Sequence, residues 1–175
     1  QGGAGGVASF GMQLAKHLGA RVITTCSAAN ADYVRSLGAD QVIDYNKEDF
    51  TKVVKDCDAV FDTVGGETFL RSLNAARIGG KVVSLLSTPL SLADTQLARL
   101  RNLSLCYELM LTPQVMKMHE ERIRQRKILE QGAKLVEAGY LGVLVTHKLP
   151  LEQAAEAHRL IEAGGMIGKV ILTMD

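Results

Sequence analysis

Short β-branched and apolar runs alternate with segments of helical periodicity through the first half of the chain, and this alternation is its most constraining feature. The runs predict strands over residues 21–26, 41–45, 58–62 and 80–86. Helical spacing between them predicts helices over residues 7–18, 30–37, 47–55 and 67–76. Strands and helices that alternate with short connections form a parallel sheet with helices on both faces. We therefore expect an α/β fold with a doubly wound parallel sheet.

The second half of the chain is less regular. Pro89 and the Ser, Thr and Asp residues around it predict a loop, residues 103–111 predict a further strand, and residues 114–138 predict one long charged helix. A strand over 143–147, a helix over 150–163 and a closing strand over 168–172 complete the predicted elements. We expect a domain boundary near residue 143, which divides the chain into residues 1–143 and residues 144–175.

The chain begins with Gln-Gly-Gly-Ala-Gly-Gly-Val-Ala, in which Gly3, Gly5 and Ala8 have the G-x-G-x-x-G/A spacing of a dinucleotide-binding turn. Such a turn aims backbone N–H groups and the N-terminus of the next helix at a pyrophosphate. It normally follows a buried strand, and here no strand-like sequence precedes it. We therefore expect that the sequence is a piece of a longer protein.

The residues that end the first predicted strand indicate which dinucleotide is bound. At this point of the fold an acidic side chain binds the ribose 2′-OH of NAD. The first acid of this chain is Asp32, inside the next predicted helix, and the strand ends in Thr25, Cys26 and Ser27. Nothing there repels a 2′-phosphate, and the Ser27 hydroxyl can donate to it. We expect NADPH ahead of NADH; the alternative is that Ser27 only caps the following helix.

Composition and charge exclude several other classes of function. The formal net charge of +1 gives no reason to expect nucleic acid or a membrane surface as a partner. No apolar run is long enough to span a bilayer. Cys26, Cys57 and Cys106 are far apart and form no C-x-x-C pair, so we expect reduced thiols in a cytoplasmic protein. The four histidines are isolated from one another, and no metal site is predicted.

Several blocks of residues follow one another along the whole chain: Gly-Gly-Ala-Gly-Gly-Val at 2–7, Gln-Leu-Ala-Lys at 13–16, Leu-Gly-Ala-Asp at 37–40, Val-Ile-Asp-Tyr at 42–45, Phe-Asp-Thr-Val-Gly-Gly at 61–66, Gly-Gly-Lys-Val-Val at 79–83, Leu-Pro-Leu-Glu-Gln-Ala-Ala-Glu-Ala-His at 149–158 and Gly-Lys-Val-Ile-Leu at 168–172. In this order they resemble the medium-chain dehydrogenase/reductase superfamily. The zinc-independent quinone oxidoreductase branch is the most similar.

The resemblance implies a Rossmann-type cofactor domain and a GroES-like catalytic domain that is absent from this sequence. The last strand, helix and strand, from about residue 144, would return to that absent domain. The resemblance also implies cofactor-binding residues. These are Gly5, Gly6 and Val7 at the pyrophosphate, Ser27 and Tyr45 near the adenosine 2′-phosphate, Val64, Leu85 and Leu86 beside the nicotinamide, and Gly168 and Lys169 from the closing strand. Gly3 joins them through its position in the glycine turn.

Two positions depart from the pattern of these relatives. Ala8 replaces the usual third glycine, which a slightly larger separation between helix and strand accommodates. Ala29 and Asn30 lie where many NADPH-using relatives have a lysine. Without that positive charge, we expect only a modest preference for the 2′-phosphate.

The function that the resemblance implies is the cofactor-binding half of an NADPH-dependent oxidoreductase that transfers hydride to a quinone or an enone. No residue is a convincing general acid, so no catalytic residue is assigned. No zinc is expected in this sequence, and the chain alone is expected to be inactive. Two alternatives stay open: a zinc-dependent alcohol dehydrogenase whose ligands lie in the absent half, and a non-catalytic dinucleotide-binding module.

The strand at residues 103–111 also predicts a homodimer. Leu103, Leu105, Tyr107, Leu109 and Leu111 alternate along it, and it contains no proline or lysine that would discourage pairing. As the last strand of a doubly wound sheet it lies at an edge, where a second copy can pair with it across a two-fold axis. The alternative is that the long helix after it covers this edge and leaves a monomer.

Overall fold

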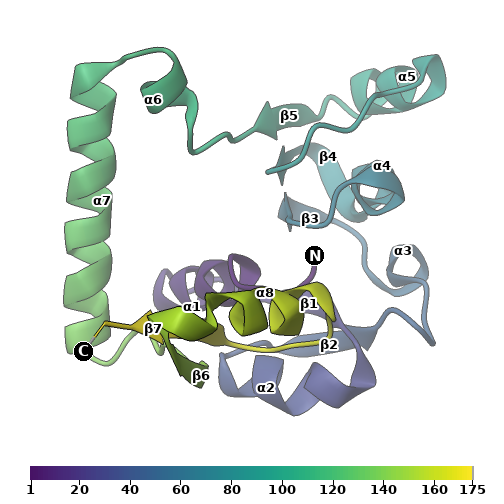
Figure 1. Ribbon diagram of the computed structural model, residues 1–175. Helices are drawn as coiled ribbons and strands as arrows, with labels where there is room; N and C mark the ends of the chain where they lie inside the picture. The colour runs from purple at the N-terminus through teal and green to yellow at the C-terminus, as the bar shows by residue number, and fades with distance from the viewer. Residues whose placement is uncertain (175) are drawn as a thin grey trace.

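The computed structural model describes residues 1–174, and Figure 1 shows how its elements are arranged. In chain order they are α1 (Ala8–His17), β1 (Ile23–Cys26), η1 (Ala28–Asn30), α2 (Ala31–Ser36), β2 (Gln41–Asp44), α3 (Phe50–Val53), β3 (Cys57–Asp62), α4 (Gly66–Ala75), β4 (Ala76–Ser84), α5 (Leu92–Leu100), β5 (Ser104–Tyr107), α6 (Thr112–Val115), α7 (His119–Glu137), β6 (Val145–Pro150), η2 (Leu151–Gln153), α8 (Ala154–Glu162) and β7 (Lys169–Thr173). Every strand pair is parallel, so the predicted α/β class of Rossmann type is confirmed.

The strands form three groups with the orders β1-β2, β3-β4-β5 and β6-β7. Within residues 1–174 no ladder joins β1 to β3. Instead, the first residues of the chain connect these two strands. The backbone N–H of Gly3 donates to the Thr25 carbonyl of β1 over 2.9 Å, and the amino group of Gln1 donates to the Phe61 carbonyl of β3 over 2.7 Å. The two halves of the sheet therefore meet at the glycine turn.

Helices cover the sheet on both faces, as two adjacent residues of β2 demonstrate. Val42 packs against a buried cluster that contains Met12 of α1 and Val34 of α2, whereas Ile43 belongs to a second cluster with Phe69 of α4. Successive side chains of a strand point to opposite faces. The two clusters therefore lie on opposite sides of the sheet. Each large apolar side chain that is fully buried there contributes about 1.5–3 kcal/mol.

The prediction of a loop around Pro89 is wrong in part, because α5 begins two residues after Leu90. Ser91 caps this helix: its hydroxyl accepts from the backbone N–H of Asp94, and the Asp94 carboxylate accepts from the backbone N–H of Ser91. A serine followed three residues later by an acid is the pattern of a capping box. The sequence therefore contained a signal for α5.

The prediction of one helix over residues 114–138 is also wrong, because α6 and α7 are separate. Between them Lys117 has a φ of 54°, a left-handed conformation that ends the first helix. The backbone N–H of Met118 then donates to the carbonyl of Pro113 over 2.8 Å and closes the turn. Two other predicted elements are shorter in the structure: the helix over 47–55 becomes α3, and the strand over 103–111 becomes β5.

The last part of the chain forms a unit of its own. Among the strands that the structure describes, β6 pairs only with β7, and α8 packs on these two strands. The long helix α7 precedes this unit and buries no side chain. Figure 1 shows α7 standing to one side of the sheets, in green. The predicted boundary near residue 143 falls between α7 and β6.

Candidate functional site

A cleft of about 510 Å³ opens beside the carboxyl ends of β1, β2 and β3. Ligands of open α/β sheets bind at this end of the strands. Four of the predicted cofactor-binding residues line the cleft: Gly5, Ser27, Tyr45 and Val64. The other lining residues are Gln1, Gly2, Ala4, Thr25, Cys26, Asn30, Glu48, Phe50, Thr68, Arg71, Gly165 and Met166. The cleft therefore brings the glycine turn together with the ends of three strands.

Gly3 does not line the cleft, but it fixes the glycine turn against β1. A Cβ atom on Gly3 would lie 2.2 Å from Oγ1 of Thr24, so only glycine fits there. The turn is also held by Thr25, whose Oγ1 accepts from the backbone N–H of Gly2 over 3.1 Å and donates to the side-chain oxygen of Gln1 over 2.9 Å. Sequence reasoning gave Thr25 no role, although it is the residue that positions the turn.

The N-terminus of α1 presents backbone donors that have no partner. Among residues 1–174, the N–H groups of Gly6, Val7 and Ala8 make no hydrogen bond, whereas the N–H of Ser9 already bonds the Gly5 carbonyl. The first N–H groups of a helix, with the positive end of its dipole, form an anion-binding site. This arrangement fits a pyrophosphate at the glycine turn.

Ser27 and Tyr45 follow the ends of β1 and β2 and line the cleft together. Ser27 occupies the N-cap position of η1, but its side chain makes no capping hydrogen bond. The alternative that its hydroxyl caps the next helix is therefore wrong, and the hydroxyl is available to a ligand. Tyr45 is 59% exposed and lines the cleft.

A buried carboxylate organises the end of β3. Asp62 is fully buried, and its oxygens accept from the backbone N–H groups of Val64 and Gly65 over 3.2 and 3.0 Å. The Ser84 hydroxyl of β4 donates to the same carboxylate over 3.0 Å. These bonds fix the turn that carries Val64 into the cleft. Sequence reasoning missed Asp62, although an aspartate directly before a Thr-Val-Gly-Gly turn is a signal for such bonds.

Leu85 and Leu86 lie beside this turn and outside the lining of the cleft. The backbone N–H of Leu85 donates to the Asp62 carbonyl over 3.2 Å. The side chain of Leu86 packs so closely on Gly65 that a Cβ atom there would lie 2.9 Å from its Cδ1. Gly65 has a φ of 76°, which independently favours glycine. The two leucines thus border the turn that carries Val64.

Lys169 brings the last strand to the glycine turn. Its Nζ donates to the carbonyl of Gly6 over 2.9 Å and lies 5.6 Å from the ring centroid of Phe10 in α1. The preceding Gly168 has a φ of 73°, and a Cβ atom there would lie 2.6 Å from the Leu144 carbonyl. The Lys169 side chain therefore reaches the first turn of α1, whereas Gly168 packs against Leu144, and neither residue lines the cleft.

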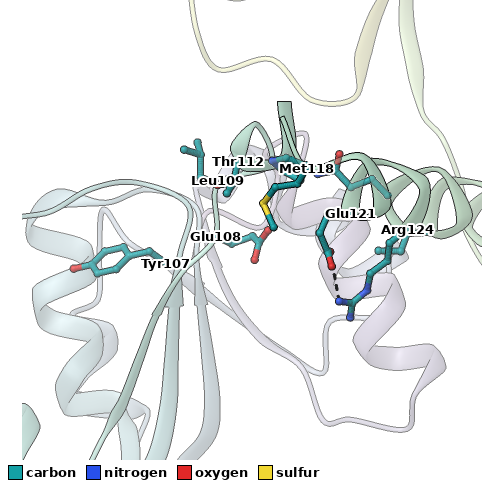
Figure 2. Close-up of a pocket in the computed structure, with 10 residues that line it drawn as sticks. Tyr107, Glu108, Leu109, Thr112, Met118, Glu121 and Arg124 are labelled. Atoms are coloured by element: carbon teal, nitrogen blue, oxygen red, sulfur yellow. Dashed lines mark ion pairs between the residues drawn. The ribbon is translucent and has the colours of Figure 1, made fainter. Parts of the chain in front are cut away.

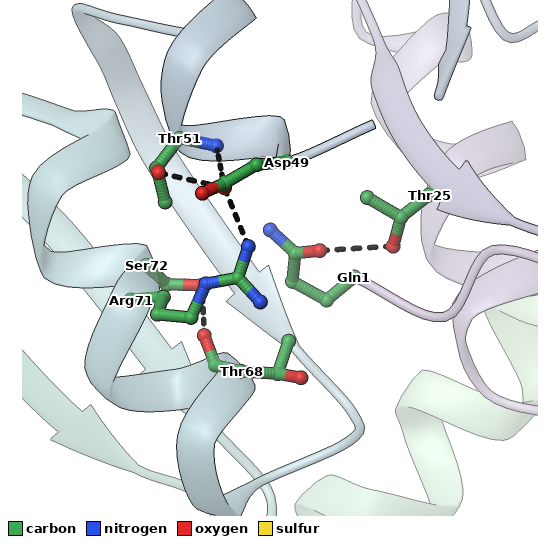
Figure 3. Close-up of polar contacts among 7 residues, drawn as sticks. All are labelled: Gln1, Thr25, Asp49, Thr51, Thr68, Arg71 and Ser72. Carbon is green, nitrogen blue, oxygen red and sulfur yellow. Dashed lines mark hydrogen bonds and ion pairs between the residues drawn. The ribbon is translucent and has the colours of Figure 1, made fainter. Parts of the chain in front are cut away.

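Arg71 of α4 is the main lining residue that sequence reasoning missed. Its Nη2 donates to Oδ1 of Asp49, which also accepts from the hydroxyl and the backbone N–H of Thr51, as Figure 3 shows. The Thr51 hydroxyl, the Arg71 guanidinium and the Thr51 N–H together lower the pKa of Asp49 from 3.8 to about 2. The guanidinium carbon lies 4.9 Å from the ring centroid of Phe50. No sequence motif predicts this pairing, because Asp49 and Arg71 belong to different elements.

The three cysteines are free, as expected. Cys26 lines the cleft at the end of β1, where burial and, to a lesser degree, the Asp44 carboxylate raise its pKa. Burial and the nearby Asp58 carboxylate raise the pKa of Cys57 in the same direction. Thiols with raised pKa values are protonated at neutral pH and are poor nucleophiles. They do not supply the chemistry of the site.

Two absences apply to the part of the chain that the structure describes. Residues 1–174 contain no group of three or more His, Cys, Asp or Glu side chains that could hold a metal ion. None of the helices described is long and apolar enough to cross a membrane.

A second cavity of about 570 Å³ lies between β5 and the α6–α7 segment. Figure 2 shows Tyr107, Glu108 and Leu109 on one side and Met118, Glu121 and Arg124 on the other. Glu121 and Arg124 form an ion pair at 3.6 Å. None of the predicted cofactor-binding residues lines this cavity.

The chain was compared with known protein families, sequences and structures. Residues 37–172 match the family of zinc-binding dehydrogenases. The chain is 30% identical to the mitochondrial NAD(P)H oxidoreductase RTN4IP1 of Danio rerio over 99% of its own length and 48% of that protein. It is 44% identical to the chloroplastic NADPH-dependent alkenal/one oxidoreductase of Arabidopsis thaliana over 47% of this chain and 22% of that protein.

Among solved structures, the quinone oxidoreductase of Coxiella burnetii is similar, with a TM-score of 0.79 and 32% identity. The match covers 99% of this chain and 51% of that protein. The chain thus spans about half the length of the relatives that it matches from end to end. It belongs to the zinc-binding dehydrogenase family of the medium-chain dehydrogenase/reductase superfamily, and it corresponds to the C-terminal half of these proteins.

Proposed function

We propose that this chain is the cofactor-binding half of an NADPH-dependent oxidoreductase. The observation that carries the proposal is the set of N–H groups at the start of α1, where Gly6, Val7 and Ala8 lack partners within residues 1–174. They lie beside a cleft at the carboxyl ends of the strands, the usual place for a dinucleotide. The oxidoreductase relatives support the reaction class.

In this proposal each group of residues has a separate task. The turn at Gly5, Gly6 and Val7 binds the pyrophosphate, Gly3 holds that turn in place, and Lys169 approaches it from β7. Ser27 and Tyr45 bind the adenosine ribose and its 2′-phosphate. The turn after β3 presents Val64, bordered by Leu85 and Leu86, to the nicotinamide as an apolar surface that limits access of water. Gly168 gives β7 the close approach that this arrangement needs.

The proposed acceptor is a quinone or an enone. Two relatives are named for such chemistry, a quinone oxidoreductase and an alkenal/one oxidoreductase. A bound reduced nicotinamide supplies the hydride. This chain's residues orient that ring at the cleft, and the proton that completes the reduction comes from solvent or from residues outside this chain. No residue of the chain is assigned as a general acid.

The proposal also covers the arrangement of the whole protein. We take residues 1–143 as the dinucleotide-binding domain and residues 144–175 as a segment of a second domain, which the separate pairing of β6 with β7 supports. We propose a homodimer through β5. A cytoplasmic location stays a prediction; the Danio rerio relative is a mitochondrial protein.

The binding proposal is tested by titrating the purified protein with NADPH and with NADH in a calorimeter. We expect NADPH to bind more tightly, because the residues directly after β1 include no acid and the Ser27 hydroxyl is available. The variant Ser27→Asp should reverse the order, since a carboxylate repels the 2′-phosphate and accepts from a free ribose hydroxyl. Equal or tighter binding of NADH by the unchanged protein would contradict the NADPH preference.

Catalysis is tested by following NADPH oxidation with a quinone and with an enone. We expect no turnover from the 175-residue chain alone, because an acceptor needs a second wall to be held against the nicotinamide. Steady-state oxidation at a rate proportional to the concentration of the chain would overturn this expectation.

A further inference from the structure

We propose that Arg71 is the residue that recognises the 2′-phosphate of the cofactor and sets the preference for NADPH. The inference rests on the proposed function, because it assumes that the cleft binds a nicotinamide dinucleotide. It adds to the proposed site a residue that determines specificity and that lies outside both the glycine turn and the end of β1. Four observations support it: the charges in the cleft, the free donors of the guanidinium, its rigid support and its position relative to Tyr45.

The cleft contains few charged side chains. Among the described residues that line it, Arg71 carries the only cationic side chain and Glu48 the only anionic one. The positions after β1 are neutral, since Ala29 and Asn30 supply no positive charge. A phosphate that carries close to two negative charges at pH 7 needs a cation nearby to offset its desolvation. Arg71 is the side chain of the cleft that meets this need.

The guanidinium of Arg71 retains most of its hydrogen-bonding capacity. An arginine has five N–H donors, and within residues 1–174 Arg71 uses one of them, from Nη2 to Asp49. Its side chain is 37% exposed and lines the cleft. Figure 3 shows the other terminal nitrogen on the side of Gln1 and Thr25, which also line the cleft. A planar fork of donors is the geometry that binds a phosphate through two parallel hydrogen bonds.

The surroundings hold Arg71 in one place. Asp49 accepts one of its donors, and the ring of Phe50 lies under the guanidinium at 4.9 Å. Asp49 is itself fixed by the hydroxyl and the backbone N–H of Thr51. An arginine fixed in this way loses little side-chain entropy when it binds a ligand. The same contacts stabilise α3 on α4, which is the structural role that any test must separate from ligand binding.

The position of Arg71 points to the adenosine end of the dinucleotide. Asp49 and Phe50 begin α3, a few residues after Tyr45 at the end of β2. The nicotinamide end, by contrast, belongs to the turn after β3 that carries Val64. Arg71 lines the same cleft as Tyr45 and Ser27, and its contacts with Asp49 and Phe50 attach it to the segment after β2. In this proposal it therefore faces the adenosine ribose, where the 2′-phosphate is the anionic group.

Glu48 makes the preference depend on a difference between two charges. Its carboxylate lines the same cleft, repels a 2′-phosphate and can accept from a ribose hydroxyl. Arg71 favours NADPH and Glu48 favours NADH, so the observed preference is the difference between the two effects. Removal of the Arg71 charge should shift the preference toward NADH, and removal of the Glu48 charge should shift it toward NADPH.

The test measures the dissociation constants of two adenosine probes, 2′,5′-ADP and 5′-AMP, and of NADPH and NADH by calorimetry on the purified protein. The variant Arg71→Gln should weaken binding of 2′,5′-ADP and NADPH by about tenfold to a hundredfold. Binding of 5′-AMP and NADH should change by less than about threefold. Arg71→Lys keeps the charge without the fork and should fall between the two proteins.

Two further variants separate recognition from structure. Asp49→Asn breaks the same ion pair but keeps the guanidinium and removes a negative charge, so NADPH should bind equally well or more tightly. Arg77→Gln is the matched control, because Arg77 forms a similar pair with Asp58 at 2.8 Å and does not line the cleft. It should leave all four dissociation constants unchanged. Thermal melting of each variant confirms that it is folded.

The outcomes distinguish the two levels of the proposal. If the unchanged protein binds neither dinucleotide, the proposed function fails and the role of Arg71 fails with it. If it binds NADPH and Arg71→Gln keeps the same ratio of NADPH to NADH affinity, the role of Arg71 alone is overturned. If Arg71→Gln and Asp49→Asn lose both dinucleotides to the same extent, Arg71 is a structural residue and the inference is wrong.

Discussion

Gln13 and Gly142 are joined by two hydrogen bonds that run in opposite directions. The side-chain Nε2 of Gln13 donates to the Gly142 carbonyl over 3.1 Å, and the backbone N–H of Gly142 donates to Oε1 of Gln13 over 2.6 Å. The same Nε2 also donates to the Ser9 carbonyl. Through these bonds α1, which begins at the glycine turn, holds the segment that connects α7 to β6.

The variant Gln13→Ala should release this connection. It leaves the N–H and carbonyl of Gly142 without this partner, and because Gly142 is exposed to water the unfolding free energy should fall by about 0.5–1.5 kcal/mol per hydrogen bond at most. Limited proteolysis should cut residues 139–144 faster than in the unchanged protein. Gln131→Ala is the control, because Gln131 is exposed on α7. Equal proteolysis of both variants would show that the two bonds contribute nothing.

Gly3→Ala and Gly6→Ala should differ in their effect. A Cβ atom on Gly3 meets Thr24, whose β-branched side chain is buried and cannot move aside, so the free energy of unfolding should fall by about 1–3 kcal/mol. A Cβ atom on Gly6 meets the Nζ of Lys169 at 2.5 Å, at the end of a flexible side chain. That chain can move, and the loss should be smaller. Urea unfolding measures both, and an equal loss contradicts the role given to Thr24.

Asp62→Asn should destabilise the protein more than Ser84→Ala. The carboxylate of Asp62 accepts three hydrogen bonds in a fully buried position. The side-chain amide of an asparagine would place its own N–H groups against one or more of the N–H and O–H groups that donate these bonds. We expect a loss of about 1–3 kcal/mol for Asp62→Asn and about 1 kcal/mol for Ser84→Ala, which removes one donor to Asp62 and the acceptor of the partly buried Leu86 N–H. Urea unfolding of the two variants measures the difference; the reverse order would argue against Asp62 as the organiser of the turn.

Acid should weaken the Asp49 contacts over a defined pH range. The pKa of Asp49 falls from 3.8 to about 2 in the folded chain, chiefly through hydrogen bonds from Thr51 and Arg71. A lowered folded-state pKa gives stability that is complete above 3.8 and is lost as the pH falls through about 2. Melting temperature should therefore depend less on pH between 4 and 2 in Asp49→Asn.

The matched control for this titration is Asp32→Asn. Asp32 pairs with Arg35 on the exposed surface of α2, with a side chain that is 99% exposed, so its pair contributes little. The pH dependence of this variant should match that of the unchanged protein. If Asp49→Asn also matches it, the hydrogen bonds around Asp49 have no effect on stability in acid.

The outer edge of β5 should carry the dimer contact. Within residues 1–174, β5 pairs with β4 and has no strand on its other side, and the second cavity lies between β5 and the α6–α7 segment. We expect a dimer by light scattering at micromolar concentration. Cys106→Pro removes a backbone donor from this strand and should shift the protein toward monomer, whereas Cys106→Ala should not. An unchanged protein that stays monomeric at high concentration would refute the dimer.

Local patterns in the sequence sufficed to predict most elements of the sheet. The run of residues 21–26 predicted β1 because β-branched side chains favour strands, and the parallel pairing followed from its alternation with helices. The break between α6 and α7 had no such signal, since the left-handed residue is Lys117 and not glycine or asparagine. Its conformation depends on the rest of the fold.

Some residues of the candidate site could likewise be predicted from the sequence, and others could not. Ser27 was found because it follows a predicted strand, Gly5 because of the spacing of the glycine turn, and Tyr45 and Val64 through the resemblance to the family. Arg71 was not found, because its place in the cleft depends on α4 packing against α3, and packing between elements leaves no periodic signal. Contacts of this kind, between elements that are separate in the sequence, can be found only from the three-dimensional structure.

We expect α7 to lie outside the cooperative unit of the described chain. It spans 19 residues without a buried side chain, and its ion pairs Glu121–Arg124 and Arg126–Glu130 are exposed pairs of the kind that contributes little. Most of the stability of protein helices comes from tertiary packing, and the contacts of α7 are peripheral ones such as the hydrogen bond from Nε2 of Gln125 to the Met110 carbonyl. Heating should therefore melt residues 119–137 gradually while the sheet is still folded. The free energy of local unfolding of α7 then depends on its own sequence and on its connections at residues 119 and 137, and not on the hydrophobic core.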